Sequence, residues 1–237
     1  MSPHRSVGSV ASRTRIGGVQ VGSAGDLSVT TTSAQRPLWQ RAAMTIGGFA
    51  VVLYVLEAFD TVASDNPLDQ WGIEPRTLDG LWGILFAPML HYGWGHLLAN
   101  TVPLLILGFL VLMSGIGRGL AATGIIWVIG GVGTWLTGGA GAHLGASVLV
   151  FGWLTYLLVR GIFTRSVGQI LLGVVVLFVY GGMLWGVLPG QYGISWQGHL
   201  FGAIGGVVAA WVLSSDTRRR RAAAPTGGPS GIQLPRI

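Results

Sequence analysis

Cysteine is absent from this sequence, and charged residues are scarce. Aspartate, glutamate, lysine and arginine together make up 9% of the 237 residues, whereas 51% are hydrophobic. Without cysteine the chain can form no disulfide, thiolate metal site or thiol nucleophile. So few charges in so apolar a chain are typical of a protein that crosses a membrane several times.

The basic residues indicate orientation in a membrane rather than binding to nucleic acid. All 14 are arginines, the net charge is +6, and most of them flank apolar runs. This arrangement is more typical of a topology signal than of a nucleic-acid-binding patch, so we expect no nucleic acid partner. The 40 glycines are too many for a soluble helical domain and suit helices that pack closely in lipid.

Six apolar runs predict six membrane-spanning helices. Each is near the roughly 20 residues that cross a bilayer core. The fourth and sixth are short, as expected where protein rather than lipid surrounds the helix ends. The runs cover residues 42–59, 94–113, 120–136, 146–159, 167–188 and 199–213. We therefore predict an all-α polytopic membrane protein, built as a six-transmembrane-helix bundle.

The remaining segments divide the chain into a membrane domain and two tails. Residues 1–41 sustain no helical or strand period and are expected to form a disordered tail. Residues 216–237 are expected to form a second, basic disordered tail. The membrane domain then covers residues 42–215, with one long loop at 60–93. This loop contains tryptophans and an apolar stretch broken by Pro88, so we expect it to dip partly into the outer leaflet.

Charge predicts the orientation of the spans. An even number of spans puts both tails on one side, and that side holds almost all the arginines. The opposite side holds Arg76 and five of the acids, which are Asp60, Asp65, Asp69, Glu74 and Asp79. By the positive-inside rule both termini are cytoplasmic, and we expect the plasma (inner) membrane.

Polar residues open the second, fourth and sixth spans, which all run from outside to inside in this topology. His91, His96 and Asn100 open the second span, Ser147 opens the fourth and His199 opens the sixth. Polar side chains in lipid are costly and are usually functional. The topology therefore predicts that these groups meet near the outer face and form a serine hydrolase site.

Each polar residue taken alone has an ordinary structural explanation. A serine in a membrane helix usually bonds its own backbone, an interfacial histidine such as His91 is usually solvated or capping, and His143 lies in a loop. His96 and Asn100 share a helix face and could form only a clasp between helices. His91 and His96 lie five residues apart and would not share a face of a regular helix. A functional site is favoured because one serine, two histidines and one asparagine are expected at the same depth in the membrane.

Glycine spacing predicts which spans pair. Glycines recur every four residues on the sixth span and bracket Ser147 on the fourth, so a partner helix can approach closely. These glycines are Gly198, Gly202 and Gly206 on the sixth span and Gly145 and Gly152 on the fourth. We expect the fourth span to pack against the sixth and to bring Ser147 within reach of His199.

Three motifs, taken together, resemble the rhomboid family of intramembrane serine proteases over roughly residues 42–215. The first is His-x4-His-x3-Asn at residues 91–100, the second is Gly145-Ala146-Ser147, and the third is His-x2-Gly-x3-Gly at residues 199–206. Their order, their spacing and the six-span topology all agree with the family. The resemblance implies a rhomboid-like bundle that cleaves peptide bonds in or next to the transmembrane segments of other proteins in the lipid bilayer.

The resemblance also implies a role for each motif residue. Ser147 would be the nucleophile and His199 the general base, with His96 and Asn100 helping to bind the oxyanion. Gly145 and the Ser147 N–H would complete that oxyanion site, with His91, Gly198, Gly202 and Gly206 in support. Glu57 is the one carboxylate within a span, so we expect a Ser–His dyad without an acidic third member. Phe151, one turn after Ser147, is placed to stack on the imidazole. No metal or other cofactor is expected.

The sequence departs from the family pattern in three places. Val148 stands where the family usually has glycine, and a β-branched side chain there could crowd the substrate or shift the oxyanion site. Trp82-Gly83 stands where many members have Trp-Arg. Residues 114–119 lack a glutamate that is often found there. The last two departures concern stability and gating more than chemistry.

Two other functions remain open at this point. The first is a catalytically inactive relative that binds membrane segments, which Val148 alone favours. The second is a metal or haem site built from His91, His96, His143 and His199, which no acidic ligand joins. The sequence does not specify an oligomeric state.

Overall fold

A computed structural model gives the fold and describes residues 36–63, 67–190 and 193–223, with side chains described through residue 215. Contacts divide the chain into two units, Met1–Pro37 and Leu38–Ile237, and the second contains every helix discussed below. Most of the two tails expected at residues 1–41 and 216–237 lies outside the described residues. Where they are described, the first helix already begins at Leu38 and the last continues through Ala223.

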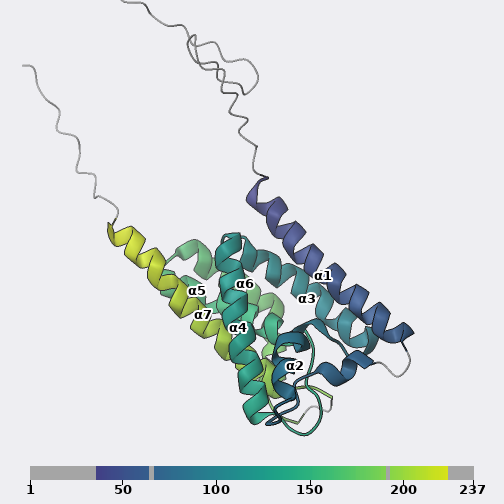
Figure 1. Ribbon diagram of the computed structural model, residues 1–237. Helices are drawn as coiled ribbons and strands as arrows, with labels where there is room; N and C mark the ends of the chain where they lie inside the picture. The colour runs from purple at the N-terminus through teal and green to yellow at the C-terminus, as the bar shows by residue number, and fades with distance from the viewer. Residues whose placement is uncertain (1–35, 64–66, 191–192, 224–237) are drawn as a thin grey trace, which may run out of the picture. The chain divides into compact units, whose positions relative to one another are not determined.

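Six helices in the described part of the chain are long and apolar enough to cross a membrane (Figure 1). They are α1 (Leu38–Val62), α3 (Gly93–Leu112), α4 (Ile116–Thr137), α5 (Ser147–Thr164), α6 (Val167–Tyr180) with its extension η3 (Gly181–Val187), and α7 (Trp196–Ala223). The predicted six-span helical bundle is confirmed, and the chain is a multi-pass integral membrane protein.

The ends of α5 differ from the fourth apolar run. The run was expected to end at residue 159, before Arg160, whereas the helix continues to Thr164. Arg160 is accommodated because its guanidinium lies over the Tyr156 ring, 5.6 Å from the ring centroid. Arg165 then ends the helix in a left-handed conformation with φ of 51°, and its N–H reaches the carbonyls of Gly161 and Ile162.

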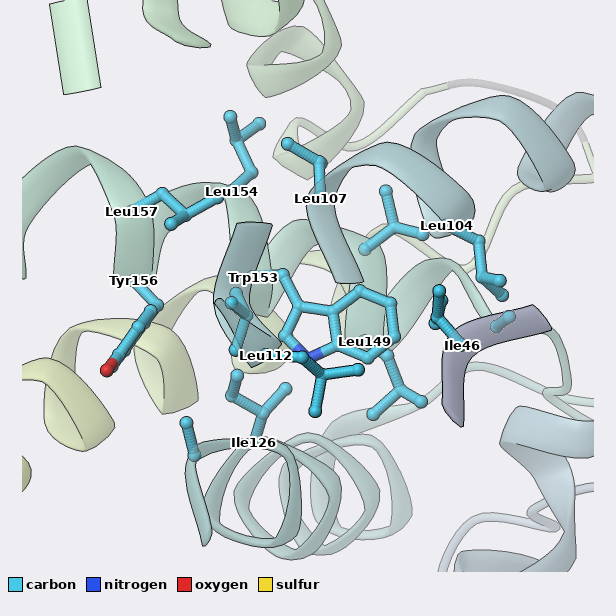
Figure 2. Close-up of a cluster of buried hydrophobic side chains, with 14 of the residues drawn as sticks. Ile46, Leu104, Leu107, Leu112, Ile126, Leu149, Trp153, Leu154, Tyr156 and Leu157 are labelled. Atoms are coloured by element: carbon cyan, nitrogen blue, oxygen red, sulfur yellow. The ribbon is translucent and has the colours of Figure 1, made fainter. Parts of the chain in front are cut away.

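α5 lies at the centre of the bundle and contacts α3, α4, α6 and α7. Its buried face forms the main hydrophobic core with residues of the surrounding helices, and Figure 2 shows Trp153 among these side chains. The indole N–H of Trp153 donates to Thr123 Oγ1 on α4 at 3.0 Å, which satisfies the one polar atom of this buried ring. The helix that begins with Ser147 is therefore fixed on several sides.

Glycines let α5 and α7 pack backbone to backbone, as their spacing predicted. A Cβ added at Gly202 would overlap the Val148 carbonyl, and one added at Gly206 would overlap the Gly152 carbonyl. Thr155 Oγ1 also donates across this interface to the Ala203 carbonyl at 2.7 Å. The predicted pairing of the fourth and sixth spans is present, and it sets the separation of their N-terminal ends.

The long loop at 60–93 is folded against the bundle. It contains η1 (Pro67–Trp71), α2 (Gly80–Phe86) and η2 (Ala87–Met89). Trp127 on α4 donates its indole N–H to the Ile84 carbonyl at 2.7 Å, and Ile73 pairs its backbone with His143. The loop is thus held against α4 and against the segment before Ser147. Its expected insertion into the outer leaflet stays a prediction.

Candidate active site

Ser147 and His199 are in contact at the N-terminal ends of two paired helices. Ser147 is the first residue of α5, and His199 lies in the first turn of α7. The distance between Ser147 Oγ and His199 Nε2 is 2.9 Å, which is a hydrogen bond. The expected contact between these two side chains is therefore present, and the close α5–α7 packing accounts for it.

The backbone around the His199 ring fixes its tautomer. Nδ1 lies 2.9 Å from the Gly186 carbonyl oxygen in η3. Because a carbonyl oxygen can only accept, Nδ1 of the neutral ring carries the proton and donates it. Nε2 is then the acceptor for the Ser147 hydroxyl proton. In a neutral imidazole this is the arrangement that a general base needs.

Phe151 supports the same ring from one face, as expected. The rings of Phe151 and His199 are stacked, with centroids 4.0 Å apart and planes 11° apart. Gly186, in contrast, was not predicted from the sequence, because any residue carries a backbone carbonyl. Its one sequence signal is the glycine itself: an added Cβ would lie 2.9 Å from Phe151 Cζ and 3.1 Å from His199 Nδ1.

His96 lies beside the loop that leads to Ser147. Its Nδ1 accepts the backbone N–H of Tyr92 at 3.3 Å, so the proton of the neutral ring is on Nε2. That edge of the ring faces Gly145, where an added Cβ would lie 2.8 Å from Nε2. Gly145 has φ of 125°, so both the backbone conformation and the space favour glycine. The result is an N–H donor close to Ser147.

Asn100 lies one turn further along α3 and is buried, with 7% of its surface exposed. Its Nδ2 donates to the His96 carbonyl at 3.0 Å, which orients the amide. Asn100 and His96 line a cavity of about 440 Å³ together with Ser147 and His199. The structure thus brings the four predicted polar groups of three helices to one cavity.

His91 precedes α3 and supports the segment before Ser147. Its Nε2 accepts the Ala146 backbone N–H at 3.3 Å, and only 2% of its surface is exposed. Of the two ordinary roles of such a histidine, solvated or capping, the structure shows the second, because His91 caps a backbone amide and is buried. Burial, helped by the nearby His96, lowers the pKa of His91 to about 3, so the ring is neutral at ordinary pH.

The two histidines of this motif lie close together although they are five residues apart. The centroids of the His91 and His96 rings are separated by 5.1 Å. The expectation that they share no face assumed a continuous helix, whereas α3 begins only at Gly93, which has φ of 76°. The turn at this glycine brings His91 back over the first turn of the helix.

Val148, the main departure from the family motif, points toward α4. A Cβ added at Gly130 on α4 would overlap the Val148 Cγ2 atom, so Gly130 provides the space for this branch. Val148 also borders a small cavity of about 20 Å³ that reaches Ser147 and Gly145. The Val148 side chain therefore fits because Gly130, on the neighbouring helix α4, has no side chain.

The histidines do not form a ligand set for a metal. Across residues 36–63, 67–190 and 193–223, no group of three or more His, Asp or Glu side chains is placed to hold a metal ion. His143 contacts Ser195 Oγ and the Gly139 carbonyl through its two ring nitrogens. In the part of the chain that the structure describes, the four histidines of the alternative metal site therefore supply no three-residue ligand set.

Comparisons with known proteins agree with the motifs and the fold. A family profile described as Rhomboid domain matches residues 78–216, which is more than half of the chain. Proteins of Mycobacterium tuberculosis and Mycobacterium bovis, both described as uncharacterized, are 51% identical over 211 residues, covering 85% of this chain and 88% of each relative. An uncharacterized protein of Mycobacterium leprae is 46% identical over 209 residues, covering 84% of this chain and 82% of the relative. The chain therefore belongs to the rhomboid family.

Proposed function

We propose that this protein is an intramembrane serine protease that hydrolyses peptide bonds in or next to the transmembrane segments of other membrane proteins. The observation that carries the proposal is the 2.9 Å contact between Ser147 Oγ and His199 Nε2. A second observation supports it: the Gly186 carbonyl accepts a hydrogen bond from His199 Nδ1, so the ring proton is on Nδ1 and Nε2 is free to accept. A serine hydroxyl is a poor nucleophile until such a base removes its proton.

In the first half of the reaction, Ser147 Oγ attacks the carbonyl carbon of the scissile peptide bond. The hydroxyl proton passes to His199 Nε2 as the new C–O bond forms. When the tetrahedral intermediate collapses, the C–N bond breaks and His199 returns that proton to the leaving amine. The product is an ester between Ser147 and the acyl part of the substrate.

The oxyanion of the tetrahedral intermediate is stabilised by donors around the loop before α5. The Ser147 backbone N–H lies in the first turn of a helix, where amides have no intrahelical acceptor and the helix dipole favours negative charge. His96 adds its Nε2 proton next to Gly145, and Asn100 adds a side-chain amide in the same cavity. Loss of one such donor typically costs about 3 kcal/mol of transition-state stabilisation.

The second half of the reaction needs water, and the 440 Å³ cavity at Ser147 is lined partly by polar side chains. A water molecule in this cavity attacks the ester carbonyl while His199 Nε2 takes its proton. The proton then returns to Ser147 Oγ as the C–O bond of the ester breaks. The enzyme is restored without a metal or an organic cofactor.

The orientation follows from the distribution of arginines, with both termini in the cytoplasm and the cavity toward the outer face of the plasma (inner) membrane. A scissile bond within a stable helix is enclosed by the hydrogen bonds of that helix. The substrate must therefore unwind locally, and segments with Gly, Pro or small residues near the cut are preferred. Equal cleavage of a stably helical poly-leucine segment would contradict this preference.

The test uses the full chain in liposomes with a model transmembrane substrate, and compares wild type with Ser147→Ala and His199→Ala. We expect each substitution to lower kcat by at least about 10³-fold while the protein stays folded, because the nucleophile or its base is lost. A fluorophosphonate probe should label wild type and not Ser147→Ala. Cleavage by Ser147→Ala at the wild-type rate, or a folded wild type that neither cleaves nor reacts with the probe, would refute the proposal.

A further inference from the structure

His143, which the proposed chemistry does not use, joins three segments around the cavity. Its backbone exchanges two hydrogen bonds with Ile73 in the first loop, at 2.8 and 2.9 Å. Its side chain reaches in the other direction, where Nδ1 lies 2.7 Å from Ser195 Oγ, directly before α7. One residue of the segment before Ser147 is thus bonded both to the first loop and to the helix that carries His199.

The direction of the His143–Ser195 hydrogen bond follows from the other ring nitrogen. His143 Nε2 lies 3.3 Å from the Gly139 carbonyl oxygen, which can only accept. Nε2 of the neutral ring therefore carries the proton, and Nδ1 accepts the hydroxyl proton of Ser195. This contact orients the Ser195 hydroxyl, because its proton is directed at His143 Nδ1 and its lone pairs are directed elsewhere.

Those lone pairs cap the first turn of α7. Ser195 Oγ accepts the Gly198 N–H at 3.3 Å, and the Ser195 carbonyl accepts the His199 N–H at 3.2 Å. A serine that bonds the third amide of a helix in this way is an N-cap, and it satisfies donors that otherwise have no partner in the helix. The backbone of His199 is therefore held by the same serine that His143 orients.

The space around His143 is shaped for this residue. A Cβ added at Gly138 would lie 2.9 Å from His143 Nε2, and one added at Gly72 would lie 3.0 Å from the His143 carbonyl oxygen. Glycines on two different segments thus leave room for the ring and for its backbone pairing. His143 and Ser195 also both line the 440 Å³ cavity, so their contact borders the space that Ser147 and His199 share.

We propose that His143 is a positioning residue for the hydrolysis. Through the hydroxyl of Ser195 it fixes the first turn of α7 and so keeps His199 Nε2 at hydrogen-bonding distance from Ser147. This inference rests on the proposed protease function. Because a small displacement of a catalytic group lowers the rate of a folded enzyme, the effect falls on turnover rather than on substrate binding.

The test compares two substitutions of His143 in the full-length protein. His143→Leu removes the acceptor, whereas His143→Asn keeps an acceptor, Oδ1, on Cγ, where the histidine has Nδ1. We expect His143→Leu to lower kcat by about 10- to 100-fold with KM changed by no more than about twofold. His143→Asn should recover most of that loss, which a general loosening of the loop would not produce.

Arg76 offers a matched control for a structural effect on the same segment. Its Nη1 donates to the carbonyls of Gly138 at 2.9 Å and Leu136 at 3.3 Å, so it also joins the first loop to the segment before Ser147, but through backbone carbonyls rather than through the cap of α7. Arg76→Gln should leave kcat within about twofold of wild type even where it lowers the thermal stability as much as His143→Leu does.

A double substitution tests whether His143 acts through Ser195. Ser195→Ala removes both the cap and the donor to His143, so it should be at least as harmful as His143→Leu. If His143 acts through Ser195, the double variant should be no slower than Ser195→Ala alone. Independent, multiplicative losses would overturn the proposal, as would a wild-type kcat for His143→Leu or equal rates for the Leu and Asn variants.

Amide hydrogen exchange of the peptide that covers residues 195–199 gives a readout that needs no hydrolysis. Exchange should be faster in His143→Leu and Ser195→Ala than in wild type, His143→Asn and Arg76→Gln. Unchanged exchange in His143→Leu refutes the positioning role even if the enzyme is active. A wild type that cleaves nothing, together with the expected exchange pattern, would instead refute the protease function and leave the link between His143 and α7 intact.

Discussion

α5 and α6 follow each other in the chain, yet they have opposite environments. About two thirds of α5 (67%) is buried inside the protein. In the span formed by α6 and η3 the buried share is 11%, although this span has the higher mean hydropathy. In water the more apolar helix would be the more buried one. In a membrane the apolar surface faces lipid, and small or polar residues mark the packed faces.

The parts of the proposed site lie on helices that differ in this burial. Ser147 begins the helix that is packed on several sides, so its position is fixed by the core. Among the described residues, the lipid-facing α6 reaches the site through its extension η3, where the Gly186 carbonyl accepts from His199 and Met183 lines the cavity. Catalytic groups on rigid elements hold their geometry better than groups on mobile ones. We therefore expect the packing of a residue, rather than its apolar character, to determine how much its substitution changes stability or kcat.

A large effect on folding, on the recovery of protein as well as on its stability, is expected from Gly206→Leu at the α5–α7 interface. An added Cβ would overlap the Gly152 carbonyl and Thr155 Oγ1, and a backbone atom cannot move aside without separating the helices. Overpacking of this kind costs about 1–3 kcal/mol or more. We expect a sharply lower thermal unfolding temperature and poor recovery of folded protein in detergent. The matched control is Gly124→Leu on α4, where an added Cβ meets no atom within 4 Å; equal losses in both variants would contradict the comparison.

The Val148–Gly130 pair should show compensation between two helices. Gly130→Ala places a Cβ on the Val148 Cγ2 atom and should destabilise the fold by about 1–3 kcal/mol. The double variant Gly130→Ala with Val148→Ala removes the overlap and should recover most of that loss. Unfolding in detergent, followed by intrinsic tryptophan fluorescence, measures both. A double variant less stable than Gly130→Ala alone would show that the two residues do not share this space.

Gly186→Ala should separate turnover from stability. The added Cβ would press on Phe151 Cζ and on His199 Nδ1 from the exposed end of the α6 segment. We expect kcat to fall about tenfold, which corresponds to about 1.4 kcal/mol in the barrier, with little change in unfolding temperature. Gly182→Ala, one turn earlier and with no atom within 4 Å of an added Cβ, is the control and should keep its activity. An unchanged kcat for Gly186→Ala would show that the ring tolerates displacement.

The smallest effect is expected at Phe178 on α6, a large side chain that is 91% exposed. Because its surroundings in the membrane are lipid, Phe178→Ala should change the free energy of unfolding by no more than about 0.5 kcal/mol. Trp153→Ala in the core should cost about 3–5 kcal/mol by the same measurement. Comparable losses at both positions would show that α6 packs against something in the membrane, such as a second protein.

The sequence was enough to predict the six spans, the pairing of the fourth and sixth, and the convergence of the polar groups. These features follow from apolar runs, glycine spacing and the alternation of span direction, all of which are local patterns. The end of α5 was less accurate, because the prediction ended the apolar run at the charge of Arg160. That charge lies over the ring of Tyr156, four residues earlier on the same helix face, and this pair was not considered.

The acceptor for His199 and the partner of His143 could not be predicted from local patterns. Gly186 acts through a backbone atom, and Ser195 is an ordinary N-cap residue until its neighbour across the cavity is known. Both depend on loops that approach one another only in the folded protein. The roles assigned to Ser147, His199, His96 and Asn100 stay predictions until activity is measured.

The partner of His199 Nδ1 is a main-chain oxygen, and this has a consequence for how the site responds to mutation. An aspartate in that role could be erased by a single codon change, whereas a peptide carbonyl survives every substitution at its own position. Substitution at residue 186 therefore acts on the site through the bulk of the new side chain, which would press on the rings of Phe151 and His199.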